Sequence, residues 1–344
     1  YKYCKRGEIM KYSHIDGLDK PISKIVFGTA TPKLFAAVSD NATEKDKADA
    51  FALLDDVYAA GINTFDCAAH YGEEILGEWM EVRGIREKCV VITKCAHPNK
   101  WRHRVTDFDI LSDIHDSLKK LRTDYVDIYM LHRDNEEVAV SVVADVMNRL
   151  YSEGKIKLFG GSNWTHKRIE ELNDYAREHN MQGFTVSSPN FGLAEQIADP
   201  WLCDAHFGNG CVTISGRDNA DARKWYAENK IPVFAYSSLA RGFFSGVFKS
   251  DEPEKAKAFL DEPGRIGYFC DDNFEKLKRC EILAKEKNVT VAQIAIAWIY
   301  NQDFEVYAIS SPVTKEQLDA NIAAMDIELC ENEVKWLNLE RSDV

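Results

Sequence analysis

The sequence has no long apolar run, no excess of positive charge and no paired arrangement of cysteines. No segment of about 18 apolar residues occurs, so no membrane-spanning helix is expected, and no secretory signal pattern is visible. Acidic residues (56) outnumber basic ones (43), for a net charge of −13. Such a chain has no general electrostatic attraction to nucleic acid or to an anionic membrane, although 102-RHR-104 is a local basic candidate.

The nine cysteines include no CxxC pair and no Cys/His spacing typical of zinc sites. Several, such as Cys89 and Cys95, lie in apolar runs. This pattern indicates buried, reduced thiols in a cytoplasmic protein. A metal site built from Cys203, His206 and Cys211 is the alternative to a polar loop that happens to hold them. The polar loop is favoured, and no metal is expected.

Short apolar runs alternate with segments of helical periodicity, and no linker interrupts the pattern. The expected strands are residues 25–27, 63–66, 90–94, 126–131, 156–161, 184–187, 232–236 and 306–309. The expected helices are residues 46–60, 75–83, 109–121, 138–152, 165–179, 218–229, 272–288, 290–300 and 315–324. Strands separated by helices pair in parallel through right-handed crossovers. Eight such units predict a closed (β/α)8 TIM barrel, and the absence of GxGxxG after the first strand argues against a Rossmann domain.

We expect residues 1–344 to form a single barrel domain, with 1–22 as an amino-terminal extension or hairpin and 325–344 as a carboxyl-terminal helix and tail. Two segments exceed ordinary loop length, 188–217 after the sixth strand and 237–271 after the seventh. Both follow the carboxyl end of a strand, where barrel active sites lie. Since the chain begins with tyrosine rather than methionine, it is either trimmed or a module of a longer polypeptide.

Polar side chains end three consecutive strands. Asp66 ends the second strand and Tyr71 follows it, in 61-GINTFDCAAHYG-72. Lys94 ends the third strand, in 90-VVITKC-95, and His132 ends the fourth, in 128-IYMLHRD-134. Each residue alone is an ordinary strand-end residue. Because the carboxyl ends of parallel strands meet at one rim, the four together predict a catalytic site.

The chemistry that suits these four groups is proton delivery by tyrosine. A free phenol has a pKa of about 10, and the ammonium of Lys94 would lower the pKa of Tyr71. Asp66 would hold Lys94 in place, and His132 would orient a substrate oxygen. This arrangement suits a reaction that creates an alkoxide, such as hydride addition to a carbonyl, for which a cofactor must supply the hydride.

The motifs GINTFDCAAHYG, VVITK and YMLHRD resemble those of the aldo-keto reductases, NAD(P)H-dependent (β/α)8-barrel oxidoreductases, in their bacterial-type branch. The resemblance covers roughly residues 12–325. It implies a catalytic tetrad of Asp66, Tyr71, Lys94 and His132, with Tyr71 as the general acid. His70 is not a tetrad member and is expected to be a rim residue. The implied reaction is reduction of a small aldehyde, ketone or sugar carbonyl, with NADPH or NADH as cofactor.

Further matching segments imply cofactor contacts. In 160-GGSNWT-165, Ser162 and Asn163 would bind the nicotinamide carboxamide. In 235-AYSSLARGFFSG-246, Tyr236 would stack on the nicotinamide ring. The remaining contacts that the resemblance implies are Ser237, Leu239 and Gly242 at the pyrophosphate, Gly28, Thr29 and Asp66 beside the cofactor, and Gln317 and Asn321 at the adenosine end.

Two positions depart from the family pattern. Ser187 or Ser188 stands where the family usually has glutamine, so a weaker, water-mediated contact with the carboxamide is expected. Val313 stands where many NADPH-dependent members have a basic residue for the 2′-phosphate, and Lys315 or a nearby hydroxyl compensates only in part. We hypothesise a relaxed choice of cofactor that leans towards NADH, which a strong preference for NADPH in binding titrations would refute.

The substrate is the least determined feature of the sequence. Trp101, Trp164 and Trp201 are candidate pocket walls, although each is equally expected to pack against its own loop. Polar loops favour a sugar-like or polar aldehyde. The alternative functions are a cofactor-binding regulatory subunit and a reductase module of a larger polypeptide. The expected partner is a small carbonyl compound, in a monomer or small homo-oligomer.

Overall fold

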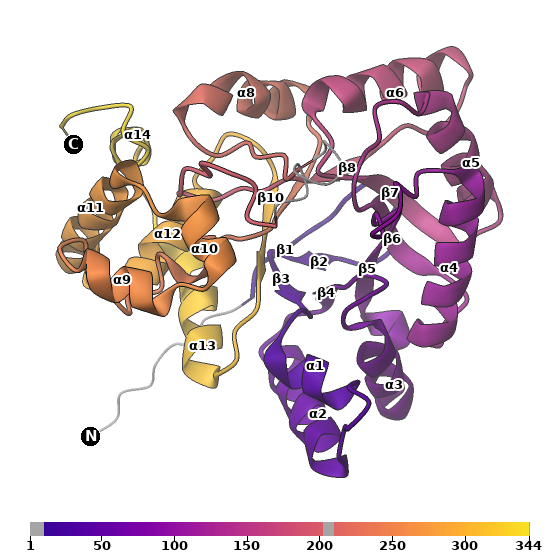
Figure 1. The fold of residues 1–344 in the computed structure, drawn as a ribbon, viewed down its shortest axis with the longest axis horizontal. Coiled ribbons are helices and arrows are strands. Elements are labelled where there is room, and N and C mark those ends of the chain that lie inside the picture. Colours follow the sequence, from indigo (N-terminus) through magenta and orange to yellow (C-terminus); the bar gives the residue numbers. More distant parts are fainter. Residues whose placement is uncertain (1–9, 202–209, 344) are drawn as a thin grey trace.

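Eight parallel strands form a closed barrel in the computed structural model, which describes residues 10–201 and 210–343 (Figure 1). The strands are β3 (Ile25–Gly28), β4 (Thr64–Asp66), β5 (Val90–Cys95), β6 (Val126–Leu131), β7 (Ile156–Ser162), β8 (Val186–Ser188), β9 (Val233–Ala235) and β10 (Val306–Ser310). The barrel closes where β10 pairs with β3, with Ala308 opposite Ile25. The expected (β/α)8 barrel is therefore confirmed.

Helices surround the strands (Figure 1). They are α1 (Pro32–Ala37), α2 (Glu44–Ala59), α3 (Glu73–Arg83), α4 (Asp107–Leu121), α5 (Val140–Ser152), α6 (His166–Glu178), α8 (Ala220–Asn229), α9 (Pro253–Phe259), α10 (Glu262–Tyr268), α11 (Asp271–Lys287), α12 (Val291–Tyr300), α13 (Lys315–Ala323) and α14 (Glu331–Leu337). The sequence did not predict α1, α9 or α10, because helices this short show too few turns for their periodicity to be recognised. Since α9 and α10 lie inside 237–271, that long segment contains two short helices and is not irregular throughout.

Threonine side chains start many of these helices. In each case the hydroxyl accepts a hydrogen bond from a backbone N–H in the first turn, which would otherwise lack a partner. The capping residues are Thr31, Thr43, Thr106, Thr165, Thr290 and Thr314. The sequence therefore determines these boundaries locally.

Side chains alternate between two hydrophobic cores along each strand. Val90 and Ile92 of β5 face the barrel interior, while Val91 faces the helical layer. Ile128 and Met130 of β6 face the interior in the same way. Because this period of two fixes the direction of every following residue, it also decides which strand-end side chains enter the barrel mouth.

A two-stranded hairpin covers the amino end of the barrel. It consists of β1 (Tyr12–Ser13) and β2 (Ile22–Ser23), and Ile15 and Ile22 join the interior core. Lys20, within the hairpin, forms a 2.7 Å ion pair with Asp127 at the start of β6. The opposite, carboxyl end of the barrel is therefore where an interior site has access to solvent.

The segment after β8, unlike the one after β9, has no helix in its described parts. In its described parts, residues 189–201 and 210–216, no helix or strand occurs. Cys203 and His206 of the alternative metal group lie outside the described residues. Among the described helices, none is both long and apolar enough to cross a membrane.

Candidate active site

Three neighbouring strands deliver inward-facing polar side chains to the carboxyl rim. Lys94 continues the inward phase of Val90 and Ile92 on β5, and His132 continues that of Ile128 and Met130 on β6. Asp66 ends β4, the strand that pairs with β5. Parallel pairing in this register therefore brings the acid, the amine and the imidazole together, as the sequence predicted.

Lys94 lies at the centre of this group. Its Nζ atom is 2.5 Å from Oδ1 of Asp66 and 3.3 Å from the phenol oxygen of Tyr71, and it also donates to the carbonyl of Cys67 at 3.1 Å. Lys94 and Asp66 are both about 95% buried. The ring of His132 lies 6.3 Å from that of Tyr71, centroid to centroid.

Burial and charge compete to set the pKa values of these groups. Burial by itself would lower the pKa of Lys94, but the carboxylate of Asp66 and the phenol of Tyr71 outweigh it and raise that pKa, so the amine stays protonated. Burial raises the pKa of Tyr71 to about 12, and Lys94 lowers it only in part. The expectation that Lys94 brings this pKa below that of a free phenol is therefore wrong. Tyr71 carries its proton at neutral pH.

A tight turn positions Tyr71. Ala68 and Tyr71 exchange two backbone hydrogen bonds, of 3.1 and 2.9 Å. Gly72 follows with a φ of +78°, and a Cβ atom there would lie only 1.9 Å from the hydroxyl oxygen of Thr29. That hydroxyl donates to the carbonyl of Asp66 at 2.9 Å and is completely buried. Thr29, expected beside the cofactor, thus links the Tyr71 turn to β4.

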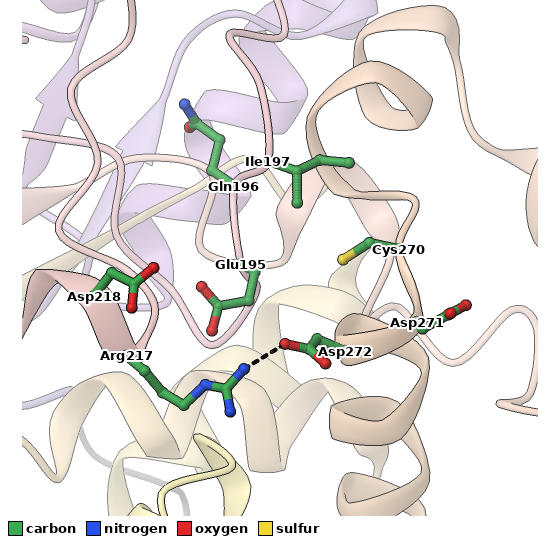
Figure 2. A pocket seen from close by; sticks show the side chains of 8 residues that line it. All are labelled: Glu195, Gln196, Ile197, Arg217, Asp218, Cys270, Asp271 and Asp272. Carbon is green, nitrogen blue, oxygen red and sulfur yellow. Dashed lines mark hydrogen bonds and ion pairs between the residues drawn. The ribbon is translucent and has the colours of Figure 1, made fainter.

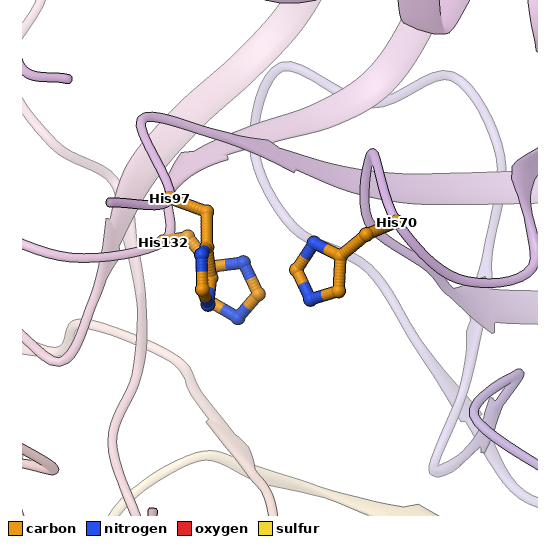
Figure 3. A group of neighbouring side chains, drawn as sticks. All are labelled: His70, His97 and His132. Carbon is orange, nitrogen blue, oxygen red and sulfur yellow. The ribbon is translucent and has the colours of Figure 1, made fainter. Parts of the chain in front are cut away.

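Two more histidines lie beside His132 (Figure 3). The rings of His70 and His97 are 4.5 Å apart, and their centroids lie 5.4 and 4.9 Å from that of His132. Sequence reasoning missed His97. Its approach depends on Ala96, whose φ of +59° breaks the strand alternation and whose N–H is held by Asp113. The only signal in the sequence was the position of His97, three residues beyond Lys94 on the same rim.

These imidazoles are neutral at physiological pH. Although His70 is exposed at the surface, partial desolvation of its ring, followed by the charges of His97, Lys94 and other nearby groups, lowers its pKa to about 4. Burial also lowers the pKa of His97, and it brings that of His132 well below its usual value. A neutral ring keeps one N–H donor and one lone pair, so His132 can donate a hydrogen bond to a substrate oxygen.

Asn163, Ser162 and Tyr236 form one hydrogen-bonded network above β7 and β9. The amide nitrogen of Asn163 donates to the carbonyl of His132 at 3.1 Å and to the Ser162 hydroxyl at 3.2 Å. Its oxygen accepts from the Tyr236 hydroxyl at 2.6 Å and from the N–H of Val212 at 3.2 Å. Both donors and both lone pairs of the amide are thus in use. Binding of a carboxamide by Asn163 would therefore require one of these bonds to open.

Ser187 does not face the barrel mouth. Since Val186 points into the interior, the next residue points to the helical layer, where the Ser187 hydroxyl lies 2.8 Å from the Tyr226 hydroxyl of α8. The assignment of Ser187 as a cofactor contact is therefore wrong. Ser188, two residues after Val186, faces the barrel interior, and its hydroxyl donates to the carbonyl of Phe234 at 2.9 Å.

The segment after β9 is a tight turn with several residues in the left-handed conformation. Ser237, Arg241 and Gly242 have φ values of +57°, +54° and +93°, and Leu239 lies between them. Tight turns with left-handed residues present backbone N–H groups to anions in many proteins. Arg241 adds a cation, although it is paired with Asp261. Because the N–H of Gly242 already donates to the carbonyl of Leu239 at 3.0 Å, the role of these residues at the pyrophosphate stays a prediction.

The expected adenosine contacts hold the turn between β10 and α13. Oε1 of Gln317 accepts from the N–H of Val313 at 2.9 Å, and Asn321 donates to the Ser310 hydroxyl at 2.8 Å. On the neighbouring strand, a Cβ atom on Gly28 would lie 2.7 Å from the Ser311 hydroxyl oxygen. β3 and β10 are therefore closely apposed at this rim.

The three tryptophans have different environments. Trp101 and Trp201 are 77% and 46% exposed. Trp164 is completely buried and packs edge-on against Phe184 at 4.9 Å. Because Trp164 has no accessible surface, its assignment as a pocket wall is wrong. The basic candidate 102-RHR-104 is also not an open patch, since its arginines pair with acidic residues of α4.

A separate polar cavity of about 470 Å³ lies between the segment after β8 and the start of α11 (Figure 2). It contains none of the expected site residues. Its lining residues are Glu195, Gln196, Ile197, Arg217, Asp218, Cys270, Asp271 and Asp272. Arg217 pairs with Asp272 at 2.6 Å. Because the lining has four carboxyl groups and one guanidinium, it does not suit a pyrophosphate.

Comparisons with known proteins agree with the geometry. The profile of the Aldo/keto reductase family matches residues 24–338. An aldo-keto reductase of Strobilurus tenacellus is 26% identical over 91% of this chain and 87% of its own length. The NADP(+) aryl-alcohol dehydrogenase of Phanerodontia chrysosporium is 26% identical over 85% of this chain and 76% of its own. An aldo-keto reductase structure from Klebsiella pneumoniae, in complex with NADPH, shares the fold with a TM-score of 0.68 and 22% identity, and covers 98% of this chain and 96% of that one.

Proposed function

The chain belongs to the aldo/keto reductase family of NAD(P)H-dependent oxidoreductases, and we propose that it reduces a small aldehyde, ketone or sugar carbonyl with Tyr71 as the general acid. The observation that carries this proposal is the buried series from Asp66 through Lys94 to Tyr71, joined at 2.5 and 3.3 Å. An ordinary structural ion pair would not require a phenol as the third member, at the mouth of the barrel.

Each side chain has one task in the proposed reaction. Neutral His132 donates a hydrogen bond to the carbonyl oxygen and polarises it. Tyr71 gives its proton to the alkoxide, which is far more basic than a phenolate, so a pKa of about 12 is suitable for the donor. The ammonium of Lys94 stabilises the phenolate that remains, and Asp66 holds that ammonium in place.

A bound nicotinamide cofactor supplies the hydride in this chemistry. The residues proposed to hold it are Tyr236 at the ring, the turn from Ser237 to Gly242 at the pyrophosphate, and Gln317 with Asn321 at the adenosine end. Ser188 replaces Ser187 as the proposed stand-in for the family's glutamine, since it has the inward phase. Asn163 is proposed to position Tyr236 through their 2.6 Å hydrogen bond.

The name of the Phanerodontia relative makes an aromatic aldehyde the first substrate to test. The assay follows NADPH or NADH absorbance with an activated aromatic aldehyde, for the parent protein, Tyr71→Phe and Tyr151→Phe. Tyr151 is 45% exposed and serves as the matched control. Since general acid catalysis contributes about 10²–10⁴-fold, Tyr71→Phe should lose at least about 100-fold in kcat, while the control retains the parent rate.

Cofactor binding, measured by fluorescence titration, separates catalysis from binding. Tyr71→Phe should bind the cofactor as tightly as the parent protein does. Full activity in Tyr71→Phe would contradict the assignment of the general acid. Tight cofactor binding without turnover on aldehydes, ketones or sugars in the parent protein would instead support a regulatory, cofactor-binding role.

A further inference from the structure

Three imidazoles from three successive strand–helix connections converge at the barrel mouth. His70 follows β4, His97 follows β5 and His132 follows β6, and one ring nitrogen of each lies within 4.8 Å of the others (Figure 3). Figure 3 shows the His70 ring facing the other two from the opposite side. The proposed reductase chemistry uses only His132, so it does not account for this convergence.

The hydrogen bonds of these rings leave nitrogen lone pairs available. Nδ1 of His97 lies 2.8 Å from the carbonyl oxygen of Pro98. A carbonyl can only accept, so Nδ1 carries the proton and Nε2 of the neutral ring keeps its lone pair. Histidine ligands of metal ions are commonly oriented by this type of bond. Nδ1 of His132 is buried and has no hydrogen-bond partner among the described residues.

We propose that His70, His97 and His132 form a binding site for a divalent transition-metal ion and that Zn²⁺ is the preferred ion. Three protein ligands and an open fourth position are a common zinc arrangement. Imidazole also suits Ni²⁺ and Cu²⁺, whereas Mg²⁺ and Ca²⁺ prefer oxygen ligands, which this group does not offer. The site is distinct from the cysteine group considered from the sequence.

A modest closure completes the zinc geometry. With Zn–N bonds of about 2.0–2.1 Å, tetrahedral ligand nitrogens lie about 3.3 Å apart, compared with the present upper limit of 4.8 Å. His70 is exposed and lies on the Tyr71 turn, so its side chain has room to approach the other two. The required movement is on the scale of a side-chain rotation.

Neighbouring charges make binding reversible rather than permanent. Arg133 is next to His132 in the chain, and Lys94 lies on the strand paired with β6, so both cations are near the site and repel a metal ion. Asp66 compensates the charge of Lys94. The metal is therefore a ligand that competes for the site and not a resident cofactor.

Metal binding also has a consequence for catalysis, and this part rests on the proposed function. An ion bound to the His132 nitrogen that faces the carbonyl oxygen takes the place of the N–H at that nitrogen, because the ring proton then lies on the other nitrogen. The ion also occupies the space in front of the ring. Zn²⁺ should therefore inhibit reduction in competition with the carbonyl substrate. A chelator should restore the rate.

The binding test uses Co²⁺ as a spectroscopic substitute for Zn²⁺, on the full chain without a histidine tag. One Co²⁺ per chain should give visible d–d absorption of tetrahedral intensity, and Zn²⁺ should abolish it. His97→Gln keeps a side chain that can donate to Pro98 but is a poor ligand, and His70→Ala removes a ligand from the exposed side. Each should weaken binding about tenfold or more, and His115→Ala, in the exposed surface of α4, should not.

Circular dichroism confirms that each variant is folded before titration. Absence of the tetrahedral spectrum, or equal binding by His97→Gln and the parent protein, would overturn the metal site. Thiolate-to-cobalt charge-transfer bands would assign the ion to a cysteine and overturn it as well. These readouts do not require reductase activity, so they are independent of the proposed function.

The inhibition test measures the rate of each variant with and without Zn²⁺, relative to its own uninhibited rate. The proposal is supported if Zn²⁺ inhibits the parent protein competitively and its inhibition constant is at least about tenfold higher for His97→Gln. Stimulation by Zn²⁺, or inhibition of equal strength in His97→Gln, contradicts the competitive role. If no variant or parent turns over any carbonyl while Co²⁺ binds as expected, the proposed function fails and the metal site stands.

Discussion

The ammonium of Lys94 is the residue on which the candidate active site most depends. It is 4% exposed, and its charge is compensated by Asp66 at 2.5 Å. A buried ion pair is costly to break because the remaining charge has neither water nor a partner. The same pair that positions the proposed general acid therefore also limits which substitutions the barrel tolerates.

Asp66→Asn is the first test at this scale. The substitution leaves Lys94 without a counter-charge and should reduce the free energy of unfolding by about 3–5 kcal/mol, measured by urea unfolding. Asp49→Asn is the matched control, because Asp49 pairs with Lys45 on an exposed helix surface, and it should change stability little. Equal losses in the two variants would show that burial of the Lys94 pair has no special cost.

Glu73 should make the folded protein less stable as pH rises, which is the opposite of the usual effect of a carboxyl group. Its carboxyl is 2% exposed, and one of its oxygens, Oε2, has no hydrogen-bond partner among the described residues and lies 3.7 Å from the ammonium of Lys120. Burial raises the pKa of Glu73, and the hydrogen bond from Thr93 together with the charge of Lys120 offsets this only in part. The folded state then holds a proton that the unfolded state releases. This contribution to stability is complete below pH 4.5 and is lost as pH rises through the folded pKa.

Glu73→Gln should therefore raise the urea midpoint at pH about 7.5 and flatten its decline above pH about 4.5. Glu74→Gln, at the exposed neighbouring position, is the control and should leave both unchanged. A lower midpoint for Glu73→Gln at every pH would mean that the ionised carboxylate is a favourable partner in the folded protein.

At the scale of elements, helix packing places the strand ends. α3 follows the Tyr71 turn and crosses α4 closely at Gly77, where a Cβ atom would lie 2.4 Å from the carbonyl oxygen of Lys120 and 2.6 Å from the backbone of Leu121. Only glycine permits this approach. The two helices thereby hold β4 and β5 next to each other, with the catalytic candidates at their ends.

Gly77→Ala should separate α3 from α4 and lower the free energy of unfolding by about 1–3 kcal/mol. The gain in helix propensity from alanine is smaller than the steric cost. Val82→Ala, on the exposed face of α3 at 58% exposure, is the control for thermal or urea unfolding. A more stable Gly77→Ala protein would show that the contact yields easily.

At the scale of the whole molecule, the cofactor should bind the folded barrel and not the unfolded chain. A ligand at about 100 times its Kd then adds about 2.7 kcal/mol to the free energy of unfolding. Val313 offers no guanidinium for a 2′-phosphate, and Lys315 is paired with Asp319 at 3.3 Å. NADPH and NADH should therefore raise the melting temperature at similar concentrations. A shift produced by NADPH alone would refute the hypothesis of relaxed cofactor choice.

The sequence predicted which residues form strands better than it predicted which side of the strand each side chain faces. The inward direction of Lys94 and His132 followed from their strands, whose boundaries were placed correctly at the start. β8 has only three residues, Val186–Ser188, and the side chain of Ser187 faces the helical layer. Because successive residues face opposite sides, a short strand leaves too few residues to fix its phase from sequence.

The sequence by itself determined the order of the strands and of the longer helices, the threonine caps and the residues that end the strands, because these depend on short-range periodicity and local hydrogen bonds. Only the tertiary structure decided that His97 joins His70 and His132, since that depends on a left-handed turn at Ala96 held by a distant carboxylate. The pKa of Tyr71 was likewise decided by the fold. Desolvation sums over every neighbour of the phenol, and here it exceeds the effect of the single ammonium that the sequence made visible.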